Sequence, residues 1–219
     1  MQQQRITFSS GDLKLESVLC LPDDDGPFPC VILCHPHPLY GGSMNNNVVD
    51  TVCNALVNAS IAAFKFNFRG VGRSQGRYDD GRGEGEDARN ALKYVSKLDE
   101  IDAARIGLCG YSAGAAFSLP VCWNDERVKA IAAISPPLDM FDFSFIADCD
   151  KPLLLASGSD DDFTPADRFI AFCGSLGDTS EQEVVIGADH FWCGYEPKLA
   201  ERVASFFTKA FAVDNPNPL

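Results

Sequence analysis

The sequence predicts an α/β fold: a doubly wound, mostly parallel sheet with antiparallel strands at its N-terminal edge and no large cap domain. Two observations carry this prediction. Apolar runs typical of buried strands alternate with segments of helical spacing from Cys30 onward. A serine between two glycines, Ser112 in the stretch Gly110–Gly114, stands between such a run and a series of small helix formers. The length of 219 residues fits one domain, which we expect to span residues 1–219.

The N-terminal half begins with a predicted hairpin. Residues Arg5 to Leu21 alternate loosely between apolar and polar, and Ser10-Gly11-Asp12 interrupts them as a turn, so two antiparallel edge strands are expected. The apolar run Cys30–Cys34 predicts a strand buried on both faces. The next elements are predicted as a helix at Asn47–Ala59, a strand at Ala62–Phe68 and a helix at Glu84–Lys97 with acidic residues in its first turn.

The C-terminal half continues this alternation. The run Arg105–Cys109 predicts the strand before Ser112, and the small residues after it predict a helix to about Trp123. Further strands are expected at Val128–Ile134, Pro152–Ser157 and Glu181–Ile186, further helices at Pro165–Ser175 and Pro197–Ala212, and a frayed tail at Asp214–Leu219. Ligands of such sheets bind at the carboxyl ends of the strands, which is where Ser112 is expected.

Ser112 is the candidate nucleophile. The pattern G-x-S-x-G alone is weak, but a strand before it and a helix after it are typical of a sharp turn that exposes a serine hydroxyl. Such a turn predicts a strained backbone with positive φ at Ser112, and glycines at positions 110 and 114 let the strand and helix pass closely. The alternative is an ordinary glycine-rich connection between a strand and a helix.

A serine needs a base, and the chain has only three histidines. His190 follows a predicted strand at the sheet edge expected for Ser112, so it is the candidate general base. The acid that orients it is sought in Asp160-Asp161-Asp162, which follow the predicted strand ending at Ser157. These carboxylates could instead favour a turn or a helix N-terminus. The resulting order is serine, aspartate, histidine.

The chain resembles small, cap-less bacterial serine hydrolases of the α/β-hydrolase superfamily, an esterase and dienelactone-hydrolase-like branch. The resemblance covers nearly the whole chain and is carried by five stretches: His35-Pro36-His37-Pro38-Leu39-Tyr40-Gly41-Gly42-Ser43-Met44-Asn45-Asn46, Asn67–Ser74, Gly110–Gly114, the aspartates before Phe163-Thr164-Pro165, and Gly187–Phe191. It implies Asp161 as the acid, four residues before the proline. Thr164 replaces the usual valine there, and Asp160 and Asp162 remain alternatives.

An acyl transfer also requires two N–H donors for the oxyanion. The backbone N–H of Ala113 is expected to be one, since it lies at the start of a helix. The second should come from the loop His35–Gly42, in which prolines cannot donate. The resemblance implies Leu39 first and Tyr40 second. His35 and His37 are expected to shape this loop. The predicted pocket walls are Leu39, Tyr40, Phe191 and Trp192, and the last three are the predicted substrate-binding residues.

Composition excludes several function classes. A net charge of −13 disfavours nucleic acid and anionic membranes. The N-terminus lacks a signal-peptide pattern, and the nine scattered cysteines form no C-x-x-C pair, so a cytoplasmic protein with free thiols is expected. His35-x-His37 lacks further histidine ligands for zinc, and Gly70-x-Gly72 lacks the third glycine of a dinucleotide loop. No metal and no cofactor are predicted.

The sequence therefore predicts a serine hydrolase that cleaves a small carboxylic ester or thioester through an acyl-enzyme on Ser112, with His190 as the base and Asp161 as the acid. The alternatives are an amidase or lactonase that uses the same residues, or a catalytically silent binding or scaffold protein. A small-molecule substrate is the expected partner. A homo-oligomer is possible, and the sequence does not indicate its size.

Overall fold

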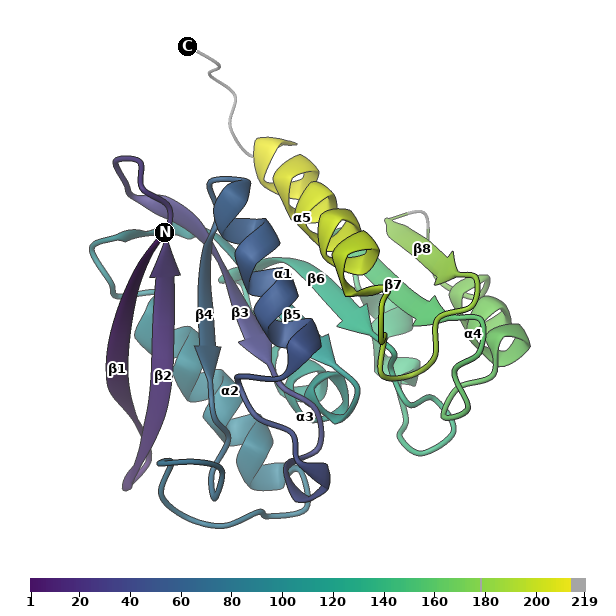
Figure 1. The fold of residues 1–219 in the computed structure, drawn as a ribbon, viewed down its shortest axis with the longest axis horizontal. Coiled ribbons are helices and arrows are strands. Elements are labelled where there is room, and N and C mark those ends of the chain that lie inside the picture. The colour runs from purple at the N-terminus through teal and green to yellow at the C-terminus, as the bar shows by residue number, and fades with distance from the viewer. Residues whose placement is uncertain (178, 214–219) are drawn as a thin grey trace.

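The computed structural model describes residues 1–177 and 179–213 of the chain. Within this part, eight strands form one sheet (Figure 1). They are β1 Gln2–Ser10, β2 Leu13–Leu21, β3 Phe28–Cys34, β4 Ala62–Phe66, β5 Ile101–Tyr111, β6 Val128–Ile134, β7 Leu153–Gly158 and β8 Ser180–Val185. The tail 214–219, predicted to be frayed, lies outside the described residues.

The strand order is β1-β2-β4-β3-β5-β6-β7-β8. β1 and β2 form the predicted antiparallel hairpin, and β2 is also antiparallel to β4. From β4 to β8 every neighbouring pair is parallel. The carboxyl ends of these parallel strands consequently meet along one edge of the sheet, with β5 near the middle.

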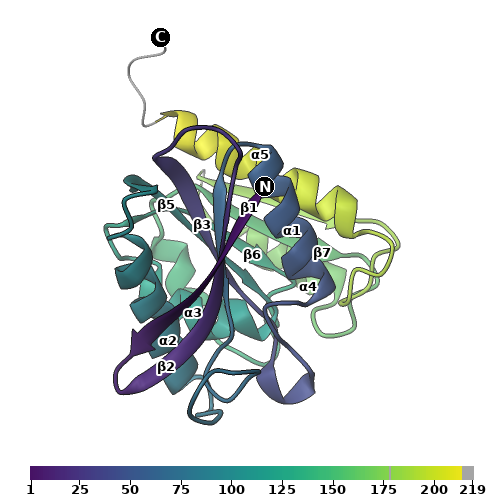
Figure 2. The same ribbon diagram turned by 60° about the vertical axis from the view of Figure 1, so that its left-hand side comes forward.

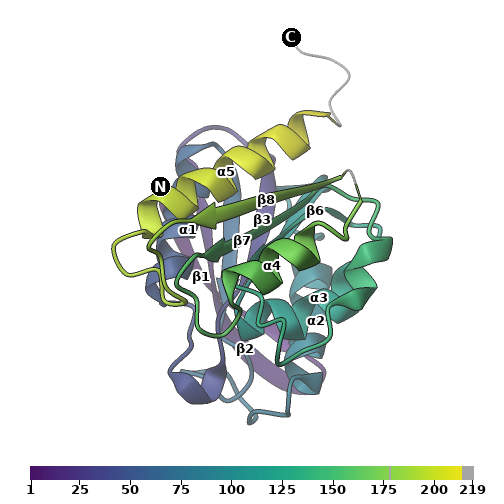
Figure 3. The ribbon, with the colours of Figure 1, turned by 90° about the vertical axis from the view of Figure 1, so that its right-hand side faces the viewer.

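Five α-helices cover both faces of the sheet: α1 Asn47–Asn58, α2 Arg82–Val95, α3 Ala113–Cys122, α4 Ala166–Cys173 and α5 Glu196–Val213. α1 and α5 pack on one face, whereas α2 and α3 pack on the other (Figures 1 and 2). Seen from the β8 edge, α4 lies on the side opposite to α5 (Figure 3). This three-layer arrangement is the predicted doubly wound α/β fold.

The core is divided by the sheet. Buried apolar side chains form one cluster on each face of the sheet, and alternate residues of β3 belong to different clusters. Cys30 and Ile32 face the side of α2 and α3, and Val31 and Leu33 face α1 and α5. Both faces of β3 are buried, as its continuous apolar run predicted. Eight of the nine cysteines are buried free thiols, and Cys193 is exposed.

Two element boundaries differ from the prediction for identifiable reasons. α2 begins at Arg82 and not at Glu84, because the Glu84 carboxylate accepts hydrogen bonds from the backbone N–H groups of Asp79 and Gly81 and so caps the preceding turn. β4 ends at Phe66 because Asn67 and Phe68 hydrogen-bond to the loop that follows β3. In the described part of the chain, no helix combines the length and apolarity that a membrane span requires.

Candidate active site

Ser112 lies at the turn between β5 and α3. Its φ of 54° and ψ of −124° confirm the positive φ predicted for a strained turn, and its backbone N–H donates to the carbonyl of Ile134 at 2.8 Å. A Cβ at Gly110 would lie 2.4 Å from the Cα of Ala115, and one at Gly114 would lie 2.3 Å from the carbonyl oxygen of Cys34. Neither position has room for a side chain, which explains the two glycines around the serine.

His190 and Asp161 meet Ser112 from different strands. Asp161 follows β7 and His190 lies in the loop between β8 and α5. The Oγ of Ser112 is 2.9 Å from Nε2 of His190, and Nδ1 of His190 is 2.9 and 3.0 Å from the two carboxylate oxygens of Asp161. With Asp161 accepting, Nδ1 carries the proton and the lone pair of Nε2 faces the serine hydroxyl.

The position of the carboxylate distinguishes the three neighbouring aspartates. Asp161 is 2% exposed, whereas Asp160 and Asp162 are exposed. Burial alone raises the pKa of the Asp161 carboxyl, but the hydrogen bonds from the His190 ring and from the N–H of Phe163 lower it more, so the pKa lies below its ordinary value. Asp161 thus stays ionised beside the imidazole, and the geometry favours it over its two neighbours.

The loop after β3 is held by its histidines. Buried His35 donates from Nδ1 to the carbonyl of Pro36 at 2.7 Å and accepts the N–H of Phe68 on Nε2 at 3.1 Å. Burial lowers the pKa of His35 to about 4, so the ring is neutral. His37 accepts the N–H of Leu39 on Nδ1 at 3.2 Å, and its Nε2 lies 3.2 Å from the hydroxyl of Tyr78.

The hydrogen bonds within this loop argue against Leu39 and Tyr40, the expected candidates for the second oxyanion donor. The N–H of Leu39 is taken by the His37 ring, the N–H of Tyr40 donates to the carbonyl of His37, and Leu39 does not line the pocket around Ser112. Among the described residues of this loop that line the pocket, His37 and Gly41 have backbone N–H groups without a hydrogen-bond partner. The backbone of His35 lies close to the start of α3, since its carbonyl oxygen would be 2.5 Å from a Cβ at Gly114. His37 is only two residues from His35, so its N–H is the better candidate.

The His37 N–H was not considered as a candidate from the sequence, because the imidazole of His37 directed attention to its side chain. The sequence did contain a signal. Pro36 and Pro38 have no N–H, so His37 is the first residue beyond His35 in this loop that can donate a backbone hydrogen bond.

A pocket of about 370 Å³ opens in front of Ser112. Its walls include Tyr40 and Phe191, as predicted, and also Met140, Phe141 and Phe163. Phe163 additionally packs against His190 with its ring tilted by 38° and ring centroids 4.3 Å apart.

Trp192 is not a wall of this pocket, and its prediction as a substrate-binding residue is corrected. The side chain is fully buried between the sheet and α5, and its Nε1 donates to Oγ of Ser135 at 3.0 Å. A φ of 62° at Trp192 accompanies this inward placement, while the neighbouring Phe191 stays 57% exposed at the pocket rim.

The sheet order, the turn at Ser112 and the serine, histidine and aspartate at one sheet edge define an α/β-hydrolase fold without a large cap domain in its described part. The dienelactone hydrolase family matches residues 75–191, more than half of the chain. The chain therefore belongs to the dienelactone hydrolase family.

The chain is also similar to three known proteins. An uncharacterised protein of Rickettsia prowazekii is 34% identical over 172 residues, which cover 75% of this chain and 72% of that protein. The structure of an alpha-beta serine hydrolase homologue from Coxiella burnetii, 34% identical, superimposes with a TM-score of 0.84 over 94% of this chain and 97% of that one. A serine hydrolase without lid from Xanthomonas campestris is 27% identical, with a TM-score of 0.82 over 100% and 97%. The chain is thus a member of a hydrolase family.

Proposed function

We propose that the protein hydrolyses a small carboxylic ester or thioester through an acyl-enzyme on Ser112. The observation that carries this proposal is the continuous hydrogen-bonded series from Oγ of Ser112 through the His190 ring to Asp161, with every distance between 2.9 and 3.0 Å. This geometry is that of a nucleophile, its general base and the acid that orients the base.

In the proposed reaction, Oγ of Ser112 attacks the carbonyl carbon while Nε2 of His190 takes its proton. The tetrahedral intermediate collapses as the imidazolium returns that proton to the leaving oxygen or sulfur, which breaks the scissile bond and leaves the acyl group on the serine. His190 then deprotonates a water molecule, which attacks the acyl-enzyme. The imidazolium returns the proton to Oγ of Ser112 as the acyl bond breaks, which releases the carboxylic acid and the free serine. Asp161 stabilises the imidazolium in both halves.

The oxyanion would be held by backbone donors. The N–H of Ala113 lies at the N-terminus of α3, where the helix dipole favours negative charge, and Ala113 lines the pocket. We assign the second donor to the N–H of His37. Preorganised donors of this kind stabilise the transition state without a net charge on either residue.

The pocket suggests the substrate class. None of its described lining residues is Lys, Arg, Asp or Glu, and five aromatic or sulfur-containing side chains form much of its wall: Tyr40, Met140, Phe141, Phe163 and Phe191. An uncharged acyl group is therefore favoured, because a carboxylate would find no counter-charge there. Its volume of about 370 Å³ suits a short aliphatic or an aromatic acyl group.

A cytoplasmic location is part of the proposal and is supported by the nine free cysteines, which fit a reducing compartment. The partner we propose is the small-molecule substrate alone. The excess of negative charge supports neither nucleic acid nor an anionic membrane as a ligand.

Labelling with a fluorophosphonate probe tests the enzyme class. We expect the folded protein to be labelled and the Ser112→Ala variant to be inert, because the probe reacts with a serine activated by a base. Absence of labelling of the folded wild type would favour a silent scaffold. Turnover of p-nitrophenyl esters of increasing chain length, with matched thioesters, lactones and amides, then identifies the bond; preferential cleavage of lactones or amides would replace the ester proposal.

A further inference from the structure

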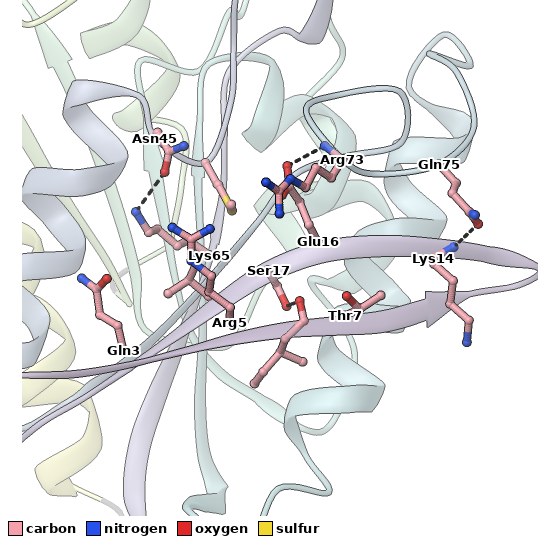
Figure 4. A pocket seen from close by; sticks show the side chains of 13 residues that line it. Gln3, Arg5, Thr7, Lys14, Glu16, Ser17, Asn45, Lys65, Arg73 and Gln75 are labelled. Atoms are coloured by element: carbon pink, nitrogen blue, oxygen red, sulfur yellow. Dashed lines mark hydrogen bonds between the residues drawn. The ribbon is translucent and has the colours of Figure 1, made fainter.

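A second pocket, of about 380 Å³, does not include Ser112 among its lining residues. Figure 4 shows the side chains that line it. Its floor is formed by one face of the β1–β2 hairpin and by β4, and its upper walls by the loops that precede α1 and follow β4. We call it the hairpin groove. Its lining residues are Gln3, Arg5, Ile6, Thr7, Lys14, Glu16, Ser17, Val18, Met44, Asn45, Lys65, Arg73 and Gln75, none of which lines the catalytic pocket.

The hairpin groove is positively charged in an acidic protein. Four cationic side chains line it against one carboxylate, that of Glu16. When Asp50, which pairs with Lys65, is included, positive charges still exceed negative charges by two. The whole chain has 18 basic and 31 acidic residues, so this local excess opposes the overall balance.

Two of the four cationic side chains, Lys65 and Lys14, already bind other residues of the protein. Lys65 is 7% exposed and binds Asp50 and the amide oxygen of Asn45. Lys14 donates to Oγ of Ser9 at 2.7 Å.

The carboxylate of Glu16 is also occupied. It accepts from the side chain of Asn67 and from the backbone N–H of Arg73, so it holds the loop after β4. The guanidinium groups of Arg5 and Arg73, by contrast, have neither an ion pair nor a hydrogen bond with any other described residue. Both side chains are exposed.

We infer that the hairpin groove binds the phosphate group of a small phosphate monoester, with Arg5 and Arg73 as its main ligands. Two unpaired guanidinium groups carry two positive charges and so match a dianion better than they match a single carboxylate. A phosphate monoester carries nearly two negative charges with three acceptor oxygens. One guanidinium group can donate two parallel hydrogen bonds to two oxygens of the same phosphate group.

The groove has room for more than a phosphate group. Gln3, Thr7 and Asn45 also line it and offer amide and hydroxyl groups to a hydroxylated body such as a polyol. This chemistry differs from that of the catalytic pocket, whose described walls hold no charged side chain. The ligand of the groove is therefore distinct from the proposed substrate.

Isothermal titration calorimetry at low ionic strength, with glycerol 3-phosphate as the probe, tests the inference. We expect saturable binding of one equivalent that weakens as salt is added, and no binding of glycerol. Arg5→Gln and Arg73→Gln should each weaken binding by at least about tenfold. Arg168→Gln is the matched control, because Arg168 lies on α4 and pairs with Asp139, and its affinity should equal that of the wild type.

Protein whose Ser112 has been blocked by a phosphonate should bind the probe with unchanged affinity, which locates the ligand outside the catalytic pocket. The inference is overturned if the wild type does not bind, if blocking Ser112 abolishes binding, or if the Arg5 and Arg73 variants, with unchanged thermal unfolding, bind like the control. Tighter binding of malonate than of glycerol 3-phosphate would replace the phosphate by a carboxylate ligand and would also overturn it.

Discussion

The assignment of the second oxyanion donor to the backbone of His37 can be tested by substitution, although a main-chain group is usually out of reach of mutagenesis. Proline at position 37 removes the N–H. The φ of His37 is −55°, within the range that the proline ring imposes, and its ψ of 123° already suits the residue before Pro38. His37→Pro should therefore delete the donor with little change in the course of the backbone.

His37→Ala is the matched control. Both variants lose the contacts of the His37 ring, including the acceptor for the Leu39 N–H and the contact with the Tyr78 hydroxyl, but the alanine variant keeps the backbone donor. Loss of one oxyanion donor costs about 2.7 to 4 kcal/mol of transition-state stabilisation, so kcat of His37→Pro should fall about 10²- to 10³-fold below that of His37→Ala.

The assay is steady-state hydrolysis of p-nitrophenyl acetate, with thermal unfolding by circular dichroism to establish that both variants are folded. If the proline and alanine variants have kcat values within about threefold of each other, a difference below about 0.7 kcal/mol, the donor is another group and the assignment to His37 is refuted.

Three further outcomes are expected. Asp161→Asn should lower kcat by about 10⁴-fold, because the amide no longer fixes the imidazole tautomer, while exposed Asp162→Asn should have wild-type kcat on the same ester; equal losses would refute the choice of acid. His35 has a folded pKa of about 4 against 6.5 when unfolded, so its contribution to stability is complete above pH 6.5 and is lost as pH falls towards 4, by up to about 3 kcal/mol. Urea unfolding at several pH values should show this slope in the wild type and a smaller one in His35→Gln. Trp192→Phe should lower the free energy of unfolding by about 1 to 3 kcal/mol, through loss of the bond to Ser135, and leave KM for the ester unchanged; a raised KM with unchanged stability would return Trp192 to the pocket.

The fold could be predicted from sequence because its signals are local and repeated. The apolar run of β3, the helical spacing of α1 and the glycines around Ser112 each determine one element, and the alternation of such elements defines a doubly wound sheet. The approach of Ser112, Asp161 and His190 also follows from this topology, since all three come after the carboxyl ends of parallel strands.

The features that sequence reasoning missed depend on loop conformation. Whether Leu39 or His37 offers a free N–H is decided by the short 3-10 turn Pro38–Tyr40, in which ring and carbonyl acceptors of His37 take the following donors. The inward turn of Trp192 depends on its positive φ, a conformation that no simple pattern indicates for tryptophan.

The hairpin groove was missed for a different reason. Its cations are far apart in the sequence, and they gather only when β1, β2 and β4 pair and the two loops fold over them. Alternation along β1 and β2 places Arg5 and Lys14 on one face, but it does not indicate that this face is hollowed.

The segment between β3 and α1 serves as a partition. Gly41, Gly42 and Asn46 face the hollow at Ser112, whereas Met44 and Asn45 face the hairpin groove. Random libraries directed at this segment would therefore alter two compartments in a single step and confuse selection for either one. Diversifying Met140 and Phe141 would reshape the reaction chamber alone, so an engineer seeking new substrate preferences should begin at that opposite wall.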